Sequence, residues 1–363
     1  MTDALAGLEP FCLLADPARY VACEWDLSED ADGRAYWTDM FRRHFRTILK
    51  LGVEMVEARR GDVADAQGRA ERAAGELDAQ LAGFIGEPKS FGRVTILVLD
   101  EWRDGTLRRH GFDDPFLDLK NRENERMLPM LTVVCQQIGE LIDPAEQFLA
   151  MVEGVFAGNI FDMGAEATAR AFLGQSPDFF STRKSLPHRP WLIDDYDALA
   201  RRILDGPVHR KCVFFIDNAG SDFLLGALPM MRWLARRGTP VVLVANERPT
   251  LNDMTIHDVR AWWPRILEAE SSLRDLPISL VSSGTGEPLI DLSRISRELN
   301  DAARDADLLI LEGMGRGVES NLNAEFICDS AKLAMIKDPS VARRHGGKVF
   351  DVICRYRTGR RLR

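Results

Sequence analysis

Two oxygen-bearing side chains, Asp217 and Asn218, directly follow an apolar run at residues 212–216. The run does not alternate with polar residues, which is typical of a strand that is buried on both faces of a parallel sheet. A glycine and a helical pattern come next, and open α/β sheets bind ligands where their strands lead into helices. A carboxylate and an amide at such a place suit a hard metal ion. The alternative is that either residue only forms a turn or caps the helix.

Polar or glycine-rich segments also follow three further apolar runs, which lie at 240–245, 278–282 and 307–311. The residues of interest are Asp253 after the second run, Gly284, Thr285 and Gly286 after the third, and Arg316 after the fourth. Because parallel strands end at the same edge of a sheet, we expect these segments to converge in one crevice. The glycine-rich loop precedes a helical pattern and can present backbone N–H groups to a phosphate.

The expected crevice contains the chemical groups of a phosphoryl-transfer site. Asp217, Asn218 and Asp253 supply only oxygen ligands, which suit Mg²⁺ or Mn²⁺ with water molecules completing the coordination. Arg316, which lies between glycines, and Lys337, at the end of an expected helix, can neutralise phosphate oxygens. A metal, an anion-binding loop and cations together stabilise the transition state of phosphoryl transfer. We therefore expect Asp217, Asp253, Arg316 and Lys337 to be catalytic.

The run Gly313-Met-Gly315-Arg-Gly317 allows a second interpretation, a nucleotide-cofactor enzyme of the methyltransferase type. The run follows a late strand, and it lacks the full spacing and the downstream acid of a dinucleotide-binding fingerprint. A third interpretation is an inactive binding module that holds a ligand without releasing phosphate. The complete set of expected metal ligands argues against both.

The N-terminal half, from about residue 37 to residue 172, has a helical pattern almost throughout. Lys120 lies one turn before Asn124 on the same helix face. Asn159 and Asp162 lie between two glycines in an apolar helical setting, where glycine is unfavourable. An ordinary helix surface and a helix-to-helix turn would explain these residues structurally. The functional hypothesis is that all four face the crevice and bind the substrate, with the helices acting as a lid.

The C-terminal half alternates strand and helix patterns, which predicts an α/β fold with a mostly parallel, doubly wound sheet and helices on both faces. The helical patterns lie at about 221–237, 255–269, 291–303 and 320–337, and a last run at 348–356 is expected at a sheet edge. Residues 94–99 fit either a short strand or a helix. A segment rich in Ser, Pro and Arg ends near residue 190, so we expect an all-helical domain at 1–190 and a catalytic α/β domain at 191–363.

The composition of the 363 residues is that of a globular protein, with 45% hydrophobic and 28% charged residues. A formal net charge of −9 gives no basic surface for nucleic acid or an anionic membrane, and no apolar run approaches the ~20 residues that span a bilayer. The six cysteines have neither metal-binding nor redox spacing. We expect a cytoplasmic protein whose partner is a small-molecule phosphate ester, and the sequence leaves open whether it forms a homo-oligomer.

Several strings in the sequence resemble the damage-control phosphatase family, which was first described as domain of unknown function 89. In the C-terminal half these strings are FFIDNAGSDFLLGALP, RRGTPVVLVANERPTLNDMT, LILEGMGRGVESN and KLAMIKDPSVARRHGGKVFDVICRY. In the helical half they are AGNIFDMGA and DPF…LKNRENERML. The resemblance extends from about residue 35 to residue 357, and it is greatest to the 4′-phosphopantetheine phosphatase domain of pantothenate kinase 4 proteins.

This resemblance implies a helical domain packed on an α/β domain. It also implies a metal-dependent phosphatase that holds manganese, cobalt, nickel or magnesium with the positions of Asp217, Asn218 and Asp253. The implied substrate is 4′-phosphopantetheine or its damaged and oxidised forms, which would place the enzyme in coenzyme A metabolism. A sugar phosphate or a broad range of metabolites is the alternative. The sequence contains no kinase half, so we expect a stand-alone enzyme.

The sequence departs from the family pattern at three places. Ala219 replaces the serine of the usual Asp-Asn-Ser-Gly, residues 284–287 replace a serine-rich loop, and Glu247 and Arg248 stand where relatives have smaller residues. The expected metal ligands are unchanged, so these departures concern the substrate rather than catalysis. We expect water to attack the phosphorus, because the sequence lacks the Asp-x-Asp pair of dehalogenase-like phosphatases. Direct attack by Asp217 is the alternative.

Overall fold

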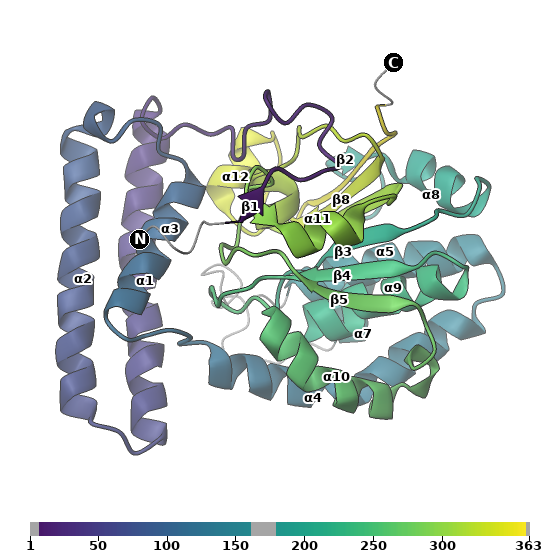
Figure 1. Cartoon of the computed structure of the whole chain (residues 1–363), viewed down its shortest axis with the longest axis horizontal. Helices are drawn as coiled ribbons and strands as arrows, with labels where there is room; N and C mark the ends of the chain where they lie inside the picture. Colours follow the sequence, from purple (N-terminus) through teal and green to yellow (C-terminus); the bar gives the residue numbers. More distant parts are fainter. Residues whose placement is uncertain (1–6, 161–178, 361–363) are drawn as a thin grey trace.

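The computed structural model of the chain describes residues 7–160 and 179–360, apart from the side chain of Phe180. A twisted sheet with helices on both faces forms the larger part of the molecule, and two long helices, α1 and α2, stand beside it (Figure 1). The predicted fold class, a mostly parallel α/β sheet with an added helical part, is confirmed.

Within the described residues, seven strands form the main sheet in the order β2-β9-β8-β7-β3-β4-β5. Neighbouring strands run parallel, except that β8 and β9 are antiparallel. A separate two-stranded ladder pairs β1 with β6. The strands are β1 (Leu8–Glu9), β2 (Ile193–Asp194), β3 (Cys212–Phe215), β4 (Val241–Ala245), β5 (Ile278–Ser282), β6 (Ile295–Ser296), β7 (Leu308–Glu312), β8 (Asp329–Met335) and β9 (Val352–Arg357).

The helices divide into those that cover the sheet and those of the layer beside it. The layer consists of α1 (Ala31–Ala58), α2 (Val63–Gly86) and α3 (Ile96–Arg109). The others are α4 (Leu117–Glu140), α5 (Pro144–Ile160), α7 (Phe179–Lys184), α8 (Tyr196–Leu204), α9 (Leu228–Arg236), α10 (Ile256–Ala269), α11 (Arg297–Ala303) and α12 (Pro339–Arg344). Short helical turns include η2 (Asp222–Ala227) and η4 (Gly315–Glu319). No helix in the described ranges is long and apolar enough to cross a bilayer.

The central strands β3, β4 and β7 are buried along their whole length, because both of their faces are covered. Phe214 of β3 faces a core shared with α4, α5, α9 and α10. Its neighbour Phe215 faces a second core, formed with α11 and with Phe11 and Leu14 from the N-terminal segment. Successive side chains of a strand point to opposite faces, so a doubly covered strand requires the uninterrupted apolar run that the sequence shows.

The layer of α1, α2 and α3 has its own core, which includes Phe41, Leu81 and Leu99. The same core continues into Leu289 and Ile336, which lie on loops at the carboxyl edge of the sheet. The layer is therefore attached to the edge of the sheet where the predicted crevice lies.

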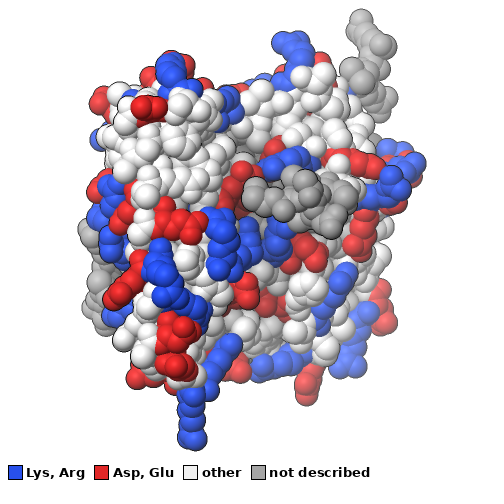
Figure 2. Space-filling view, turned by 60° about the vertical axis from the view of Figure 1, so that its left-hand side comes forward, with Lys and Arg blue, Asp and Glu red and all other residues white. Residues whose placement is uncertain are grey.

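On the face turned toward the viewer in Figure 2, acidic and basic side chains lie side by side, as expected for solvated helix surfaces.

The division of the chain at residue 190 stays a prediction, and the packing of the described residues runs across it. Helices α4 and α5 precede this residue, yet Leu131 and Phe156 from them belong to the core on one face of the sheet. The β1–β6 ladder likewise joins the N-terminal segment to the C-terminal half. In space, α4 and α5 are part of the α/β layers, and α1–α3 stand beside them (Figure 1).

Three predictions about individual elements are wrong. Residues 329–335 form strand β8 inside the predicted helix at 320–337, the helix predicted at 291–303 is limited to α11, and β9 lies between β2 and β8 instead of at an edge. Every residue of β8 after Asp329 is buried, and periodicity alone does not separate such a short apolar run from a buried helix. The ambiguous residues 94–99 lead into α3, which begins at Ile96.

Asp30 caps the N-terminus of α1, and its replacement tests how firmly this helix is fixed. Its carboxylate accepts hydrogen bonds from Gly33 N at 2.9 Å and from Trp25 Nε1 at 2.8 Å. These two bonds, with Gly33 first, lower the pKa of Asp30 below its usual value. We expect Asp30→Ala to lower the free energy of unfolding by about 1 kcal/mol at neutral pH.

The sign of the pH dependence follows from the lowered pKa. The contribution of Asp30 is complete above its unfolded pKa of about 4 and is lost as the pH falls through the lower folded pKa. Denaturant unfolding at pH 7 and at about pH 2.5 measures both values. Asp32→Ala, an exposed change in the same first turn, is the control, and equal effects of the two variants would contradict the capping role.

Candidate active site

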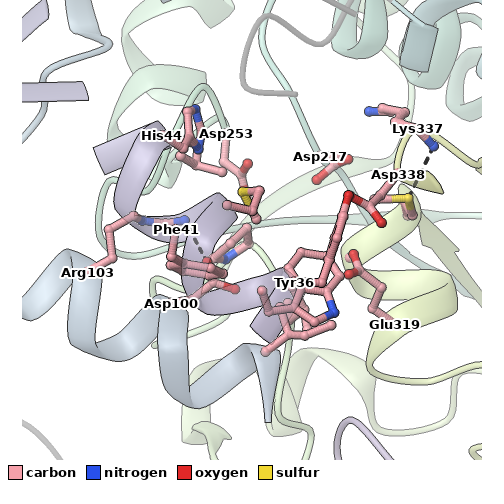
Figure 3. Close-up of a pocket in the computed structure, with 18 of the residues that line it drawn as sticks. Tyr36, Phe41, His44, Asp100, Arg103, Asp217, Asp253, Glu319, Lys337 and Asp338 are labelled. Atoms are coloured by element: carbon pink, nitrogen blue, oxygen red, sulfur yellow. Dashed lines mark hydrogen bonds and ion pairs between the residues drawn. The ribbon is translucent and has the colours of Figure 1, made fainter. Parts of the chain in front are cut away.

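A cavity of about 320 Å³ lies between the helical layer and the carboxyl edge of the sheet. The acids Asp217 and Asp253 lie in the upper part of the view in Figure 3, and Tyr36 of α1 and Asp100 of α3 lie in the lower part. The loops after β3, β4, β5 and β7 contribute to its lining, so the four segments converge as the sequence predicts, and the loop after β8 joins them.

Backbone pairing between the loops after β3 and β4 brings the two acids together. Asn218 and Asp253 form an isolated antiparallel bridge, and Met254 N donates a hydrogen bond to Asp217 O at 3.0 Å. The side chains of Asp217 and Asp253 are buried, with 9% and 3% of their surface exposed. The three expected metal ligands thus lie on two paired backbone segments.

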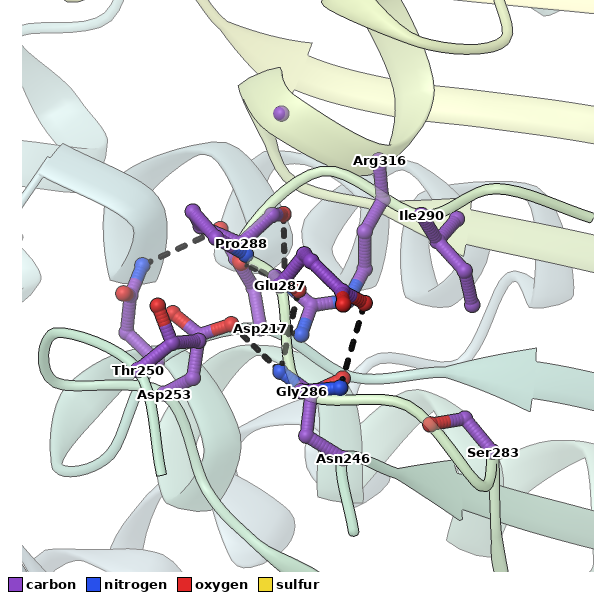
Figure 4. Close-up of polar contacts among 12 residues, drawn as sticks. Asp217, Asn246, Thr250, Asp253, Ser283, Gly286, Glu287, Pro288, Ile290 and Arg316 are labelled. Atoms are coloured by element: carbon purple, nitrogen blue, oxygen red, sulfur yellow. Dashed lines mark hydrogen bonds and ion pairs between the residues drawn. The ribbon is translucent and has the colours of Figure 1, made fainter. Parts of the chain in front are cut away.

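The guanidinium of Arg316 joins the two carboxylates (Figure 4). Its NH2 nitrogen donates to Asp253 Oδ2 at 2.6 Å, and its NH1 nitrogen contacts Asp217 Oδ1. Asn246 Nδ2 donates to the same oxygen of Asp253 at 3.0 Å. The side chain of Arg316 is 1% exposed, and a buried guanidinium of this kind offsets only part of the charge of two buried acids.

Buried amides hold Asp217 from the side opposite Arg316. Asn159 Nδ2 donates to Asp217 Oδ2 at 3.2 Å and to Asp222 Oδ2 at 2.8 Å. Asn218 Nδ2 donates to the same two oxygens at 3.1 Å and 2.9 Å. The predicted residue Asn159 therefore reaches the site, where it supports Asp217. The predicted residue Asp162 lies outside the described residues.

In the described parts of the chain, no three His, Cys, Asp or Glu side chains lie together in a way that could hold a metal ion. The expected metal centre therefore consists of two carboxylates and one amide. Burial raises the pKa of Asp217 to about 8. Burial, together with the charge of Asp222, raises the pKa of Glu312 well above its usual value. Asp222 Oδ1 and both oxygens of Glu312 are buried, and the contact with Asp222 is among the causes of the raised pKa of Glu312. A divalent cation at Asp217 and Asp253 would offset this buried negative charge, so the residues fit a metal.

Close packing around these acids explains two of the glycines that the sequence shows. A side chain at Gly313, where φ is +93°, would collide with the carboxylate of Asp217. A Cβ at Gly158 of α5 would lie 2.9 Å from the Cα atom of Asp222. Glycine at these positions lets the backbone approach the acids closely.

Lys337 reaches the cavity because it follows strand β8. This strand runs parallel to β7, so its end lies at the same edge as the loop that carries Arg316. The predicted location of Lys337 at the end of a helix is wrong, but the residue still lines the cavity. The next residue, Asp338, accepts a hydrogen bond from the Tyr36 hydroxyl at 2.7 Å and thereby ties α1 to this loop.

The loop of Gly284, Thr285 and Gly286 is not the expected anion-binding loop. Side chains of the same segment accept hydrogen bonds from all three of its backbone N–H groups: Ser282 Oγ from Gly284 at 3.0 Å, Ser283 Oγ from Thr285 at 3.2 Å and Glu287 Oε2 from Gly286 at 3.1 Å. None of the three residues lines the cavity. The expectation fails because serine and glutamate side chains in the loop take the donors that a phosphate would need.

Lys120 and Asn124 do not face the cavity either. The Lys120 ammonium is buried between Asp114 and Asp258, with Nζ–Oδ2 distances of 2.8 Å and 2.6 Å. Burial alone would lower the pKa of Lys120, but the charges of the two acids raise it above its usual value. Asn124 Oδ1 accepts a hydrogen bond from Gly220 N at 2.7 Å. Both residues therefore hold the segments next to the expected metal ligands instead of binding substrate.

Arg103 attaches the loop after β4 to α3. Its NH1 nitrogen pairs with Asp100 Oδ1 at 2.6 Å, its Nε with Asp104 Oδ1 at 2.7 Å, and its NH2 donates to Thr250 Oγ1 at 3.0 Å. Thr250 Oγ1 in turn donates to Asp104 Oδ2 at 2.6 Å. The next residue, Leu251, has a positive φ of 43° and lines the cavity, a strained conformation that this network holds in place.

The residues that the helical layer contributes to the cavity wall are not predicted from the sequence. They include Trp37, Met40 and Phe41 of α1 and Asp100 and Arg103 of α3. The aromatic and apolar residues of α1 follow the spacing of any core-facing helix, so they carry no signal of a ligand. Asp100 and Arg103 are charged residues on the buried side of α3, and a charge in such a position is the one signal that points to them.

A profile of the damage-control phosphatase ARMT1-like domain matches residues 46–353. A damage-control phosphatase of Arabidopsis thaliana is 37% identical to the chain, over 81% of this chain and 81% of that protein. A 4′-phosphopantetheine phosphatase of Mus musculus is 31% identical over 95% of this chain and 48% of that protein. Pantothenate kinase 2 of A. thaliana is 35% identical over 96% of this chain and 42% of that protein. The chain thus spans less than half the length of these last two relatives.

The fold is also similar to a solved one, the crystal structure of a DUF89 family protein from Pyrococcus horikoshii. The TM-score is 0.62, and the match covers 88% of this chain and 96% of that chain. The two sequences are 18% identical, so this likeness concerns the fold alone.

The structural role of Lys120 is tested by Lys120→Met, which keeps most of the volume and removes the charge. The change leaves Asp114 and Asp258 without their buried partner, so we expect the free energy of unfolding to fall by about 3 kcal/mol. Lys50→Met is the control, because the Lys50 side chain is 77% exposed, and it should change stability by less than about 0.5 kcal/mol. A stable Lys120→Met protein with a raised KM would instead restore the substrate-binding role.

Proposed function

The chain belongs to the ARMT1-like damage-control phosphatase family, and on that premise we propose that it hydrolyses a small-molecule phosphate monoester with a divalent metal held by Asp217, Asn218 and Asp253. The observation that supports this most is the pair of buried carboxylates, joined by Arg316, at one side of a cavity on the carboxyl edge of the sheet. Manganese, cobalt, nickel and magnesium all accept such oxygen ligands, and the proposal covers each of them.

The residues around the cavity would divide the work as follows. A metal bound by Asp217, Asn218 and Asp253 would supply Lewis-acid stabilisation of the charge on the phosphoryl oxygens. Arg316 and Lys337 balance the remaining negative charge of the phosphate, which is the main requirement for a very slow reaction. Asn159 keeps the Asp217 carboxylate in position through its hydrogen bond at 3.2 Å. The helical layer closes one side of the cavity and limits the access of bulk water.

We favour water over Asp217 as the nucleophile. Asp217 Oδ1 contacts Arg316, and its Oδ2 accepts hydrogen bonds from two buried amides. Both oxygens are therefore engaged in contacts within the protein, which leaves neither of them free to attack the phosphorus. Asp253 is tied to Arg316 and Asn246, so its role is to bind the metal and orient water rather than to act as a free base.

For the substrate we propose 4′-phosphopantetheine or its damaged and oxidised forms, which would give the enzyme a role in coenzyme A metabolism. The apolar part of the cavity lining consists of Trp37, Met40 and Phe41 of α1, together with Leu289 and Met314 of the loops at the sheet edge. Such a lining suits a long tail with methylene groups better than the many hydroxyls of a sugar phosphate. The similarity to a 4′-phosphopantetheine phosphatase supports the same choice.

The nucleotide-cofactor alternative finds no support in the loop after β7. Gly313 N donates to Leu333 O at 3.0 Å and Gly317 N donates to Gly313 O at 2.9 Å. These N–H groups are used within the fold, whereas a dinucleotide-binding loop offers its N–H groups to a pyrophosphate. The loop instead presents Arg316 to the two acids.

The proposal is tested by phosphate release from 4′-phosphopantetheine and p-nitrophenyl phosphate. We expect chelation to abolish release and added Mn²⁺ or Co²⁺ to restore it. Asp253→Asn removes one carboxylate of the metal site, so the metal-dependent rate should fall by at least about 100-fold. Asp301→Asn, an exposed change on α11, is the control and should retain the wild-type rate.

Two results would contradict the proposal. Release that persists after chelation, at the same rate in Asp253→Asn, would exclude the metal site as the catalytic centre. No release from either ester, by a protein that still binds the metal in calorimetry, would favour the inactive binding module.

A further inference from the structure

Two buried polar atoms without a hydrogen-bond partner belong to residues that line the cavity. They are the indole nitrogen Nε1 of Trp37 and the carboxylate oxygen Oδ2 of Asp100. Trp37 and Asp100 are 3% and 2% exposed, and they come from different helices, α1 and α3. Buried polar groups are nearly always hydrogen-bonded, because leaving them unpaired is costly. Their place on the cavity wall therefore points to a ligand.

We infer that Trp37 and Asp100 form a subsite that recognises an amide group in the tail of the substrate. This inference rests on the proposed phosphatase function and deepens it. An indole N–H can only donate, and an ionised carboxylate can only accept. A secondary amide meets both needs, since its carbonyl accepts from Trp37 and its N–H donates to Asp100. A second phosphate or a carboxylate could accept from Trp37, but it has no hydrogen to offer to Asp100 in its ionised form.

Both Trp37 and Asp100 are held rigidly, as a recognition site requires. Arg103 NH1 binds Asp100 Oδ1 at 2.6 Å, and the second oxygen has no partner among the described residues. In Figure 3 the carboxylate of Asp100 lies between Arg103 and the space beside Phe41 and Tyr36. The Trp37 ring is fixed by edge-on contacts with Tyr36 and Phe41, at centroid distances of 5.4 Å and 6.4 Å.

The surroundings favour an amide over a hydroxyl, which could also donate and accept. Met40 and Phe41 lie on α1 with Trp37, and Ile96 lies on α3 with Asp100. All three apolar residues line the cavity, and they would contact the methylene groups on either side of an amide. A polyhydroxyl tail would have to bury further hydroxyls against these apolar side chains. The pantetheine arm, with amides separated by methylene groups, matches this pattern.

The test measures substrate selectivity, defined as the ratio of kcat/KM for 4′-phosphopantetheine to kcat/KM for p-nitrophenyl phosphate. The second ester has no amide. Trp37→Phe removes the N–H and keeps an aromatic ring, so we expect this ratio to fall by about tenfold. Trp102→Phe is the control, because Trp102 lies on α3 outside the cavity lining, and it should keep the wild-type ratio. Burial raises the pKa of Asp100 to about 8, so assays at about pH 9 keep its carboxylate ionised.

A second measurement changes the substrate instead of the protein. Wild-type enzyme is compared on 4′-phosphopantetheine and on two analogues, in each of which one amide N–H is replaced by an ester oxygen. We expect one analogue to show a KM raised by about tenfold, because its oxygen faces Asp100 with no hydrogen to donate. This comparison of substrates remains informative even if the Trp37→Phe protein is unstable.

The outcomes separate this inference from the proposed function. If the wild type hydrolyses neither ester, the phosphatase proposal fails and the inference fails with it. If the wild type hydrolyses both, but Trp37→Phe keeps the wild-type ratio and neither analogue has a raised KM, the amide subsite alone is overturned. A fall in the relative activity of Trp37→Phe on fructose 6-phosphate, with no change for 4′-phosphopantetheine, would assign the pair to hydroxyl recognition and likewise overturn it.

Discussion

The burial of two carboxylates next to each other is the constraint on which the rest of the site depends. Asp217 and Asp253 repel one another in a region of low dielectric, and Arg316 supplies one positive charge between them. Asp222 and Glu312 add further buried acid to the same region. An assembly with this much buried negative charge is costly for a protein to keep, and a site for a divalent cation is a physical reason to keep it.

Holding these acids together requires contacts from every side. The loops after β3 and β4 pair through their backbones, α5 supplies Asn159, and α4 supplies Lys120 and Asn124. From the opposite side, Arg103 of α3 fixes Thr250 in the loop that leads to the second acid. The N-terminal helices are thus scaffolding for the acidic loops as well as a wall of the cavity, and the lid that the sequence suggests is too simple a description of them.

The two sides of the cavity differ in chemical character, and this difference indicates the kind of substrate that the cavity suits. One side collects charges that suit a metal and a phosphate, including Lys337 on the loop after β8. The other side, from α1 and α3, combines apolar and aromatic residues such as Met40 and Phe41 with charged ones, among them Arg43, Asp100 and Arg103. A phosphate ester with a long, partly apolar tail is complementary to both sides at once.

The sequence by itself determined the α/β core and the acids at its strand ends. Uninterrupted apolar runs followed by Asp217 and Asn218 specify a doubly covered parallel strand, and parallel strands bring their following loops to one edge. Asp253 and Arg316 could be assigned to the site for the same reason, because the argument needs only strand direction. Which side chains face the cavity is different, since this depends on how helices far apart in sequence pack against the loops.

Only the tertiary structure decided the roles of the remaining residues. Lys120 is a plausible substrate-binding residue in sequence, but Asp258, 138 residues away, neutralises it in the core. Thr285 lies in a loop whose own serine and glutamate side chains use its N–H groups. Trp37 has the spacing of an ordinary core residue, and only its position at the cavity without a partner separates it from one. Such partners are set by packing over long sequence separations, which local patterns do not encode.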